Sequence, residues 1–252
     1  YWDKLGDQAS AKGVLQQALA TYPDSKYHTE WLQRLAYYER LLKQWDEAES
    51  AINQILEEDP NNSTAWIELG WIYYERGDGW ESTQKAFRNA IAVDPNQGYG
   101  YFVIGQALSK EERYDEADDW FQEAILREPD NLNWQMVRAG NRRTEEEFIL
   151  AIDLYRQIVS KSPDYAPAYY EMAWTYRLYE QPQEAMEAIV QALQKLGKPN
   201  TTYLLRAGYI FEWAENYKEA MGYFQQVLVE DPNNVNALNG IQQLAEKLES
   251  SH

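Results

Sequence analysis

The sequence predicts an all-α solenoid of stacked antiparallel helix pairs, because three series of residues share one period. Small residues stand before a hydrophobic run every 34 to 37 residues, at Ala11, Ala48, Thr83, Ala117, Ala151, Ala185 and Ala220. A second series of small residues recurs every 34 or 35 residues, at Ala36, Gly70, Gly105, Ala139, Ala173 and Gly208. Prolines recur at a similar spacing, at Pro23, Pro60, Pro95, Pro129, Pro163, Pro199 and Pro232. Self-similarity at a fixed period of this length indicates a helical repeat protein.

Each period contains two helical patterns separated by a break. In residues 63–74 the first stripe occupies positions i, i+3, i+4 and i+7, at Trp66, Leu69, Gly70 and Tyr73. Gly77-Asp78-Gly79 interrupts this pattern and carries one residue more than the other periods do. The second stripe follows at Thr83, Phe87, Ala90 and Ile91. Pro95 then ends the second helix, because proline disrupts a helix interior.

The register divides the chain into a partial repeat, six full repeats and a last helix. Residues 1–28 match only the second helix of a repeat, so we expect Tyr1 and Trp2 to be the tail of a missing first helix and the chain to be a fragment of a larger protein. The six repeats are 29–62, 63–97, 98–131, 132–165, 166–200 and 201–234. Residues 235–252 are expected to form a capping helix and tail, with polar residues that shield the last hydrophobic face.

Small residues are expected to let the two helices of a pair approach closely. The repeat 132–165 departs most from the pattern, because Arg138 stands where an apolar residue is expected. Its first helix is therefore expected to be short or distorted. Thr144-x-x-Glu147 fits a capping box, which predicts that Thr144 caps the start of the second helix of this repeat.

Trp66-x-x-Leu69-Gly70-x-x-Tyr73, followed by Phe87, Ala90 and Pro95, resembles the tetratricopeptide repeat signature. The pattern returns in residues 204–232, and the resemblance extends over nearly the whole chain. It implies a right-handed superhelix whose concave groove is lined by the first helix of each pair. It also implies a non-catalytic scaffold that mediates protein–protein interaction.

By the same resemblance, the second, fifth, ninth, twelfth and thirteenth positions of each repeat point into the groove. Those positions are rich here in aromatic residues and arginine, which are enriched at binding hot spots. The candidate ligand-binding residues are Tyr37, Arg40, Trp71, Tyr74, Phe102, Gln106, Met136, Arg143, Tyr170, Trp174, Arg177, Tyr209 and Trp213. About half of the rings are expected to pack as core instead. Those expected to reach the groove are Trp71, Trp174, Tyr209 and Trp213.

An extended peptide or a helix of a partner protein is the leading ligand class for such a groove. One subclass of the family clamps a C-terminal carboxylate with Lys and Asn at the fifth and ninth positions. Those positions here include Gln33 and Tyr37, then Ile67 and Trp71, so this clamp is not expected. The alternative ligand is a glycan, because sugar rings stack on Trp and Tyr. The chain would then be an accessory domain of a larger carbohydrate-handling or membrane protein.

Composition disfavours several other functions. The chain has 41 acidic and 23 basic residues and a net charge of −18, which repels nucleic acid. It has no cysteine and only His28 and His252, so no catalytic site, metal site or cofactor is expected. Acidic runs such as Glu145–Glu147 are interpreted as solvated charge. No apolar run is long enough to insert into a membrane. The sequence leaves the oligomeric state open, and it favours a soluble, cytoplasmic domain only slightly.

Overall fold

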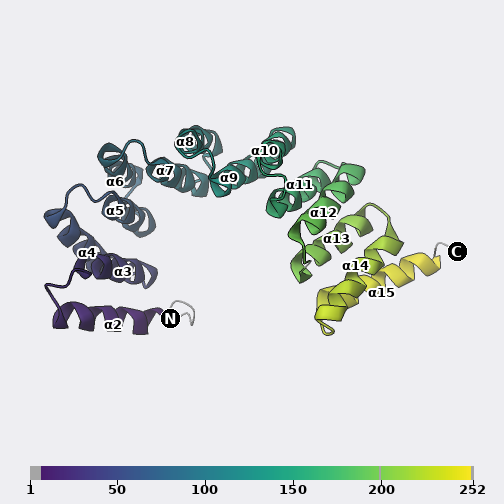
Figure 1. Cartoon of the computed structure of the whole chain (residues 1–252), viewed down its shortest axis with the longest axis horizontal. Coiled ribbons are helices and arrows are strands. Elements are labelled where there is room, and N and C mark those ends of the chain that lie inside the picture. The colour runs from purple at the N-terminus through teal and green to yellow at the C-terminus, as the bar shows by residue number, and fades with distance from the viewer. Residues whose placement is uncertain (1–6, 199, 251–252) are drawn as a thin grey trace. The chain divides into compact units, whose positions relative to one another are not determined.

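The computed structural model describes residues 7–198 and 200–250, and all the regular secondary structure in these residues is helical (Figure 1). The all-α fold class is therefore confirmed. The helices are α2 (Gln8–Thr21), α3 (His28–Leu41), α4 (Trp45–Glu58), α5 (Ser63–Arg76), α6 (Trp80–Val93), α7 (Gly98–Lys110), α8 (Tyr114–Arg127), α9 (Leu132–Thr144), α10 (Phe148–Lys161), α11 (Ala166–Leu178), α12 (Pro182–Leu196), α13 (Thr201–Trp213), α14 (Tyr217–Glu230) and α15 (Val235–Ser250). Tyr1 and Trp2, expected to be the tail of a missing helix, lie outside the described residues.

The chain forms two compact units, Tyr1–Asp130 and Asn131–His252. In the first unit, α3 pairs with α4, α5 with α6 and α7 with α8, and each pair packs on the next. In the second unit, α9 pairs with α10, α11 with α12 and α13 with α14, while α15 packs on both α13 and α14. Stacked helix pairs with a last helix covering the end of the stack are what the period predicted.

Asparagine side chains start several first helices of the pairs. The side-chain oxygens of Asn62, Asn131 and Asn200 accept hydrogen bonds from the backbone N–H three residues on, at the starts of α5, α9 and α13. Asn234 does the same before α15. Such a cap satisfies one backbone donor that the first turn of a helix leaves unpaired. Asparagine therefore stands directly before these helices for a physical reason.

Every turn between the two helices of a pair contains a residue with positive φ. Gly77 has φ of 88° and Gly79 of 91° in the turn that carries the extra residue. At the corresponding place, the other five pairs have a residue with a side chain: Lys43, Glu112, Glu146, Glu180 and Glu215, with φ between 57° and 63°. This conformation costs a residue with a Cβ atom about 1–2 kcal/mol, so five turns carry a local strain.

The predicted close approach of paired helices at the small residues is confirmed. A Cβ atom on Gly105 would lie 2.7 Å from the Phe121 ring, and one on Gly208 would lie 2.5 Å from the Phe224 ring. A Cβ atom on Gly70 would likewise meet the Phe87 ring. Each of these phenylalanines is fully buried. Glycine therefore makes room for a large ring on the partner helix.

Two expectations for residues 132–165 were wrong. The first helix, α9, spans 13 residues, as α7, α11 and α13 do, so it is neither short nor interrupted. Thr144 is the last residue of α9 rather than the N-cap of α10, and its hydroxyl donates a hydrogen bond to the Gly140 carbonyl. The N-cap of α10 is Glu147, without a side-chain cap. The turn of this pair therefore lies where it does in the other repeats, and the local capping motif does not move the start of the helix.

Candidate functional site

A pocket of ≈ 360 Å³ lies in the second unit, among α11, α13, the start of α14 and α15. It is lined by Trp174, Arg177, Tyr209, Glu212, Trp213, Glu215, Tyr217 and Lys247. We call it the Arg177 pocket. Trp174 and Arg177 come from the last turns of α11, and Trp213 is the last residue of α13, so helix ends on neighbouring first helices converge there. Four of its lining residues are among the sequence candidates.

Guanidinium groups and aromatic rings alternate along this part of the unit. The Arg177 guanidinium carbon lies 4.5 Å from the centre of the Trp174 ring and 5.8 Å from that of Trp213. Arg206 lies 3.6 Å from the centre of the Tyr170 ring and 5.2 Å from that of Trp174. Trp174 is thus approached by two cations. Cation–π contacts of this kind hold both partners rigidly when they are partly buried.

The two arginines differ in their hydrogen bonds. Arg206 donates to the Tyr170 carbonyl and to the Glu171 carboxylate, both at 3.3 Å, and Arg143 also donates to Glu171. In the described part of the chain no carboxylate pairs with Arg177, and its Nε is buried without a hydrogen-bond partner. Glu212, which lines the pocket, is paired with Lys247 at 2.9 Å. Arg177 is therefore a cation without a carboxylate partner among the described residues.

The first unit has an arginine in similar surroundings, but its donors already have acceptors. Arg40 donates to the carboxylates of Glu68 and Glu75 and lies 5.4 Å from the centre of the Tyr37 ring. Burial raises the pKa of Glu68, and the Arg40 charge offsets this effect only in part. These contacts form a closed ion-pair cluster.

Trp71 and Tyr74 form a second cluster of the first unit. Their rings pack edge to face at 5.8 Å, and the Lys110 ammonium lies 5.2 Å from the centre of the Trp71 ring. Burial, together with a hydrogen bond to the Glu111 carboxylate, raises the pKa of Tyr74 to about 12. The phenol therefore stays neutral at physiological pH.

The structure places the thirteen candidate residues at different depths. Tyr37 and Tyr209 are exposed, at 43% and 39%. Arg40 and Phe102 are buried, and Phe102 packs against the Phe121 ring at 5.4 Å. The remaining candidates are partly exposed: Trp71, Tyr74, Gln106, Met136, Arg143, Tyr170, Trp174, Arg177 and Trp213. Within the second unit, Met136 and Tyr170 also pack against the hydrophobic core.

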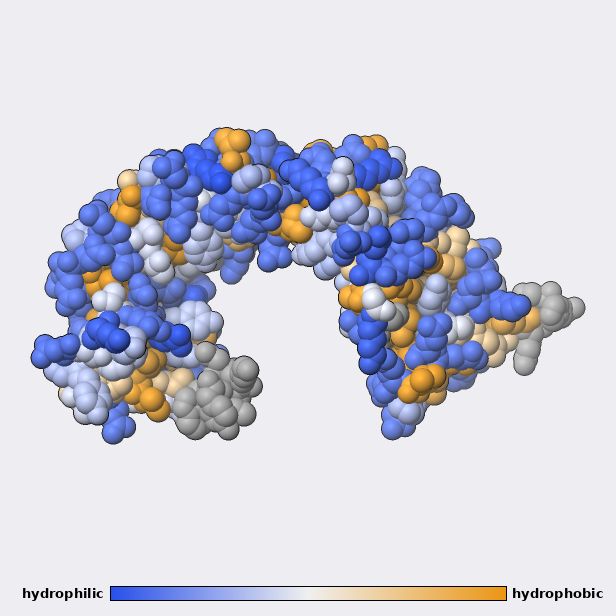
Figure 2. Space-filling view, in the orientation of Figure 1, coloured by the Kyte–Doolittle hydropathy of each residue, from blue (hydrophilic) through white to orange (hydrophobic). Residues whose placement is uncertain are grey.

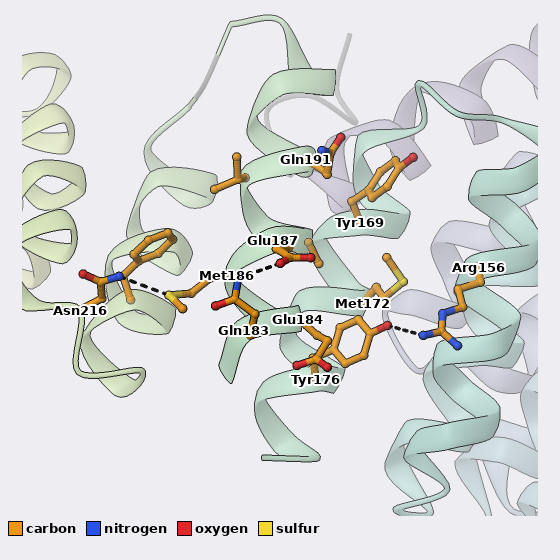
Figure 3. Close-up of a pocket in the computed structure, with 13 residues that line it drawn as sticks. Arg156, Tyr169, Met172, Tyr176, Gln183, Glu184, Met186, Glu187, Gln191 and Asn216 are labelled. Carbon is orange, nitrogen blue, oxygen red and sulfur yellow. Dashed lines mark hydrogen bonds between the residues drawn. The ribbon is translucent and has the colours of Figure 1, made fainter. Parts of the chain in front are cut away.

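Sequence reasoning missed a larger hollow of ≈ 710 Å³, which lies along α12 in the second unit (Figure 3). Met172, Met186, Val190 and Phe211 provide an apolar floor. Several polar groups around it are bonded to one another: Arg156 donates to the Tyr176 hydroxyl at 2.9 Å, and Gln183 donates to Glu187 at 2.7 Å. Met186 and Val190, four residues apart on α12, were a sequence signal for a second apolar stripe.

This hollow and the Arg177 pocket use different faces of α11. Tyr169, Met172 and Tyr176 line the hollow, whereas Trp174 and Arg177 line the pocket. At 100° per residue these two sets point in different directions from the helix axis. Hydrophilic residues cover most of the surface seen in Figure 2, and apolar residues reach it only in patches.

The described residues contain no group of three or more His, Cys, Asp or Glu side chains placed to hold a metal ion. In residues 7–198 and 200–250, no helix has the length and apolar character that crossing a membrane requires.

Comparison with known proteins identifies similar sequences and folds. Tetratricopeptide repeat family models match residues 28–72, residues 99–131, and residues 1–25 together with 202–234. No curated protein matches the sequence significantly.

Solved structures are similar over most of the chain. PilW, a type IV pilus biogenesis factor, is 20% identical with a TM-score of 0.63, over 85% of this chain and 99% of PilW. A tetratricopeptide repeat protein from Parabacteroides merdae ATCC 43184 is 16% identical with a TM-score of 0.58, over 97% of this chain and 94% of that one. Yeast Tom70 is 19% identical with a TM-score of 0.67, over 97% of this chain and 52% of Tom70. Identities this low establish the fold alone.

Proposed function

Because this chain belongs to the tetratricopeptide repeat family, we propose that it is a non-catalytic scaffold that binds an extended peptide or a helix of a partner protein on the exposed face of its first helices. Proteins with this fold generally serve as scaffolds for protein–protein interaction. The Arg177 pocket is the part of that face that carries the proposal. It combines rigid aromatic rings with a guanidinium group, the residue types that dominate binding energy at protein interfaces.

The geometry of the rings favours a peptide over a glycan. A sugar binds an aromatic side chain by stacking on the open face of the ring. The Trp174 ring is already approached by Arg177 and Arg206, and the Trp71 ring is covered by Lys110. What these clusters offer a ligand is ring edges, partly exposed apolar surface and N–H donors, which suit peptide side chains and backbone carbonyls.

Ion pairing argues against catalysis in the same region. General acid–base chemistry by two carboxyl groups needs different environments that separate their pKa values. Glu171 is held by Arg143 and Arg206, and Glu212 by Lys247. Carboxylates paired in this way serve as structural anchors for neighbouring helices.

The test is a parallel screen of the chain against a displayed random-peptide library and a glycan array. We compare the wild type with a Trp71→Ala/Trp174→Ala variant, and use Tyr169→Ala in the larger hollow as the matched control. The proposal expects peptides to be selected by the wild type and the control and lost with the double variant. Glycan capture that depends on the two tryptophans would replace the proposal with the glycan alternative, and selection indifferent to them would exclude this face.

A further inference from the structure

We propose that the Arg177 pocket recognises a carboxylate of the bound peptide, either an acidic side chain or a free C-terminus. This inference rests on the proposed function, because it assigns the chemistry of one subsite on the peptide-binding face. It concerns the twelfth position of the fifth predicted repeat, and so does not use the fifth and ninth positions at which Lys and Asn are absent.

The repeats of this chain provide their own comparison for Arg177. Three predicted repeats have arginine at the twelfth position: Arg40, Arg143 and Arg177. Arg40 donates to Glu68 and Arg143 donates to Glu171. Both glutamates stand at the sixth position of the next predicted repeat, on the neighbouring first helix. An arginine at this place is therefore satisfied by a carboxylate from the helix that follows.

At Arg177 that carboxylate is replaced by a second cation. The sixth position of the next predicted repeat is Arg206, which turns to Glu171 and the Tyr170 carbonyl instead. The thirteenth position, where Glu75 gives Arg40 its second acceptor, is occupied by Trp213. The two substitutions together remove both acceptors and put aromatic surface in their place.

The cost of this arrangement falls on a defined atom. The Arg177 Nε is buried and has no hydrogen-bond partner within the described residues. A buried donor without an acceptor costs about 1–3 kcal/mol, and more for a charged group. The terminal nitrogens of Arg177 also have no acceptor among the described residues, and they are the donors that a ligand can approach, because they are not buried.

The shape of the site fits a carboxylate rather than another acceptor. The Arg177 guanidinium carbon lies 4.5 Å from the centre of the Trp174 ring, and Arg177 lines the pocket of ≈ 360 Å³. Planar N–H pairs match the two oxygens of a carboxylate, and such bidentate pairs are among the strongest hydrogen bonds in proteins. Trp174 and Trp213 would enclose the pair and keep water from it.

The charges around the pocket permit an anion at this place. Two cations, Arg177 and Lys247, line the pocket, and Arg206, which lies near Trp174, shares its charge with Glu171. Of the two carboxylates that line the pocket, Glu212 is paired with Lys247, and Glu215 lies exposed in the turn before α14. Arg177 is then the cation of this pocket that has no carboxylate partner among the described residues, which suits an acidic group placed correctly by the rest of the ligand.

The experiment starts from peptides that the wild-type chain selects from a random library. Each peptide is synthesised with its acidic residues kept or changed to amides, and with the C-terminus free or amidated. Dissociation constants are measured by fluorescence anisotropy for the wild type, Arg177→Met and, as the matched control in the larger hollow, Arg156→Met. Circular dichroism establishes that each variant is folded.

The proposal expects that removing one particular carboxylate weakens wild-type binding by about tenfold to about a hundredfold. Arg177→Met should lose the same factor and then bind the acidic and amide forms equally, while Arg156→Met keeps the preference. Amide forms that bind the wild type as well as acidic forms, or a preference that survives in Arg177→Met, would overturn the carboxylate site and leave the peptide scaffold intact. If the wild type selects no peptide, both proposals fail. Loss on side-chain change or on C-terminal amidation tells which carboxylate is recognised.

Arg206→Glu gives a second test that keeps Arg177 in place. It restores the carboxylate found at the sixth position in Glu68 and Glu171, so Arg177 should pair internally. We expect a higher melting temperature and a loss of affinity for the acidic peptide of about tenfold or more. Unchanged affinity together with a folded variant would contradict the proposal.

Discussion

At the scale of the residue, one position of the repeat has three different environments in this chain. Arg40 has two carboxylate partners, Arg143 has one that it shares with Arg206, and Arg177 has none among the described residues. The difference arises from the neighbouring helix, since Glu68 and Glu171 are replaced by Arg206 at the same place. The side chains of the next repeat thus decide whether an arginine at this position has a carboxylate partner.

Tyr155 gives a prediction at the residue scale. Its side chain is 1% exposed on α10, and burial raises its pKa to about 12, whereas the unfolded chain titrates near the ordinary value of 10.0. The folded state therefore holds the proton longer, so this contribution is fully present below pH 10 and is lost as pH rises towards 12. Urea unfolding followed by circular dichroism measures the free energy of unfolding at each pH. Between pH 10 and pH 12 this free energy should fall by up to about 3 kcal/mol less in Tyr155→Phe than in the wild type.

The control for this prediction is Tyr22→Phe, which changes an exposed ring. The free energy of unfolding of this variant should change with pH as that of the wild type does. If Tyr155→Phe also follows the wild type between pH 10 and pH 12, the buried phenol is not the group that titrates.

At the scale of the element, helix pairs depend on matching small and large residues. Glycines at the crossing face phenylalanines, as Gly105 faces Phe121, whereas Ala173 belongs to a pair whose corresponding residue is the buried Ile189. In the α11–α12 pair the extra methyl group of alanine is thus accompanied by a smaller partner side chain. Packing at native density leaves little room for other combinations.

Gly105→Ala tests this matching. The new Cβ atom would lie 2.7 Å from the Phe121 ring, so the ring or the backbone must move, and we expect a loss of about 1–3 kcal/mol in the free energy of unfolding. Gly105→Ala/Phe121→Ile reproduces the combination in the α11–α12 pair and should recover part of the loss. Gly222→Ala, where nothing lies within 4 Å, should instead stabilise the chain by about 0.5–1 kcal/mol. Equal effects of the two single substitutions would rule out the steric explanation.

The turns give a second prediction at the element scale. Glu180 has φ of 57°, which glycine adopts without a steric penalty. Glu180→Gly should raise the free energy of unfolding by about 0.5–1 kcal/mol, after allowing for the greater freedom of glycine in the unfolded chain. Gln157→Gly, at an exposed position inside α10, should lower it by about 1 kcal/mol. Thermal unfolding measures both, and a loss of stability in Glu180→Gly would show that the turn is not strained.

The helices could be predicted from sequence and their caps could not. Three series of residues report the same period, so an error in one is corrected by the others. A capping box is a short local pattern and carries no information about where the turn lies. Glu146, two residues after Thr144, has the left-handed conformation found in the turn of every pair, so Thr144 still belongs to the preceding helix. The burial of individual candidate side chains could not be predicted from the sequence either. Arg40 and Phe102 occupy candidate groove positions but are buried, because exposure there depends on the side chains of neighbouring helices.

At the scale of the whole molecule, a large excess of negative charge lowers the stability of the folded state. The net charge is −18, and charges of one sign repel each other more strongly in the folded state than in the expanded chain. Raising the ionic strength screens this repulsion over a Debye length that falls to about 10 Å at 0.1 M. We therefore expect the melting temperature at pH 7 to rise between about 0.01 M and about 0.1 M salt.

The same salt series near the isoelectric point of ≈ 4.5 is the control. There the net charge is small, and salt should have little effect on the melting temperature. A melting temperature that falls with salt at pH 7 would mean that ion pairs such as Arg40–Glu68 outweigh the general repulsion.

The central claim, that a peptide binds the exposed face of the first helices, is tested most directly by hydrogen–deuterium exchange of the full chain with and without a selected peptide. Bound peptide is expected to slow exchange in the last turns of α11 and α13, around Arg177 and Trp213, and to leave the exposed side of α12 unchanged. Protection confined to α12, around Met186 and Val190, would place the ligand in the larger hollow and contradict the account.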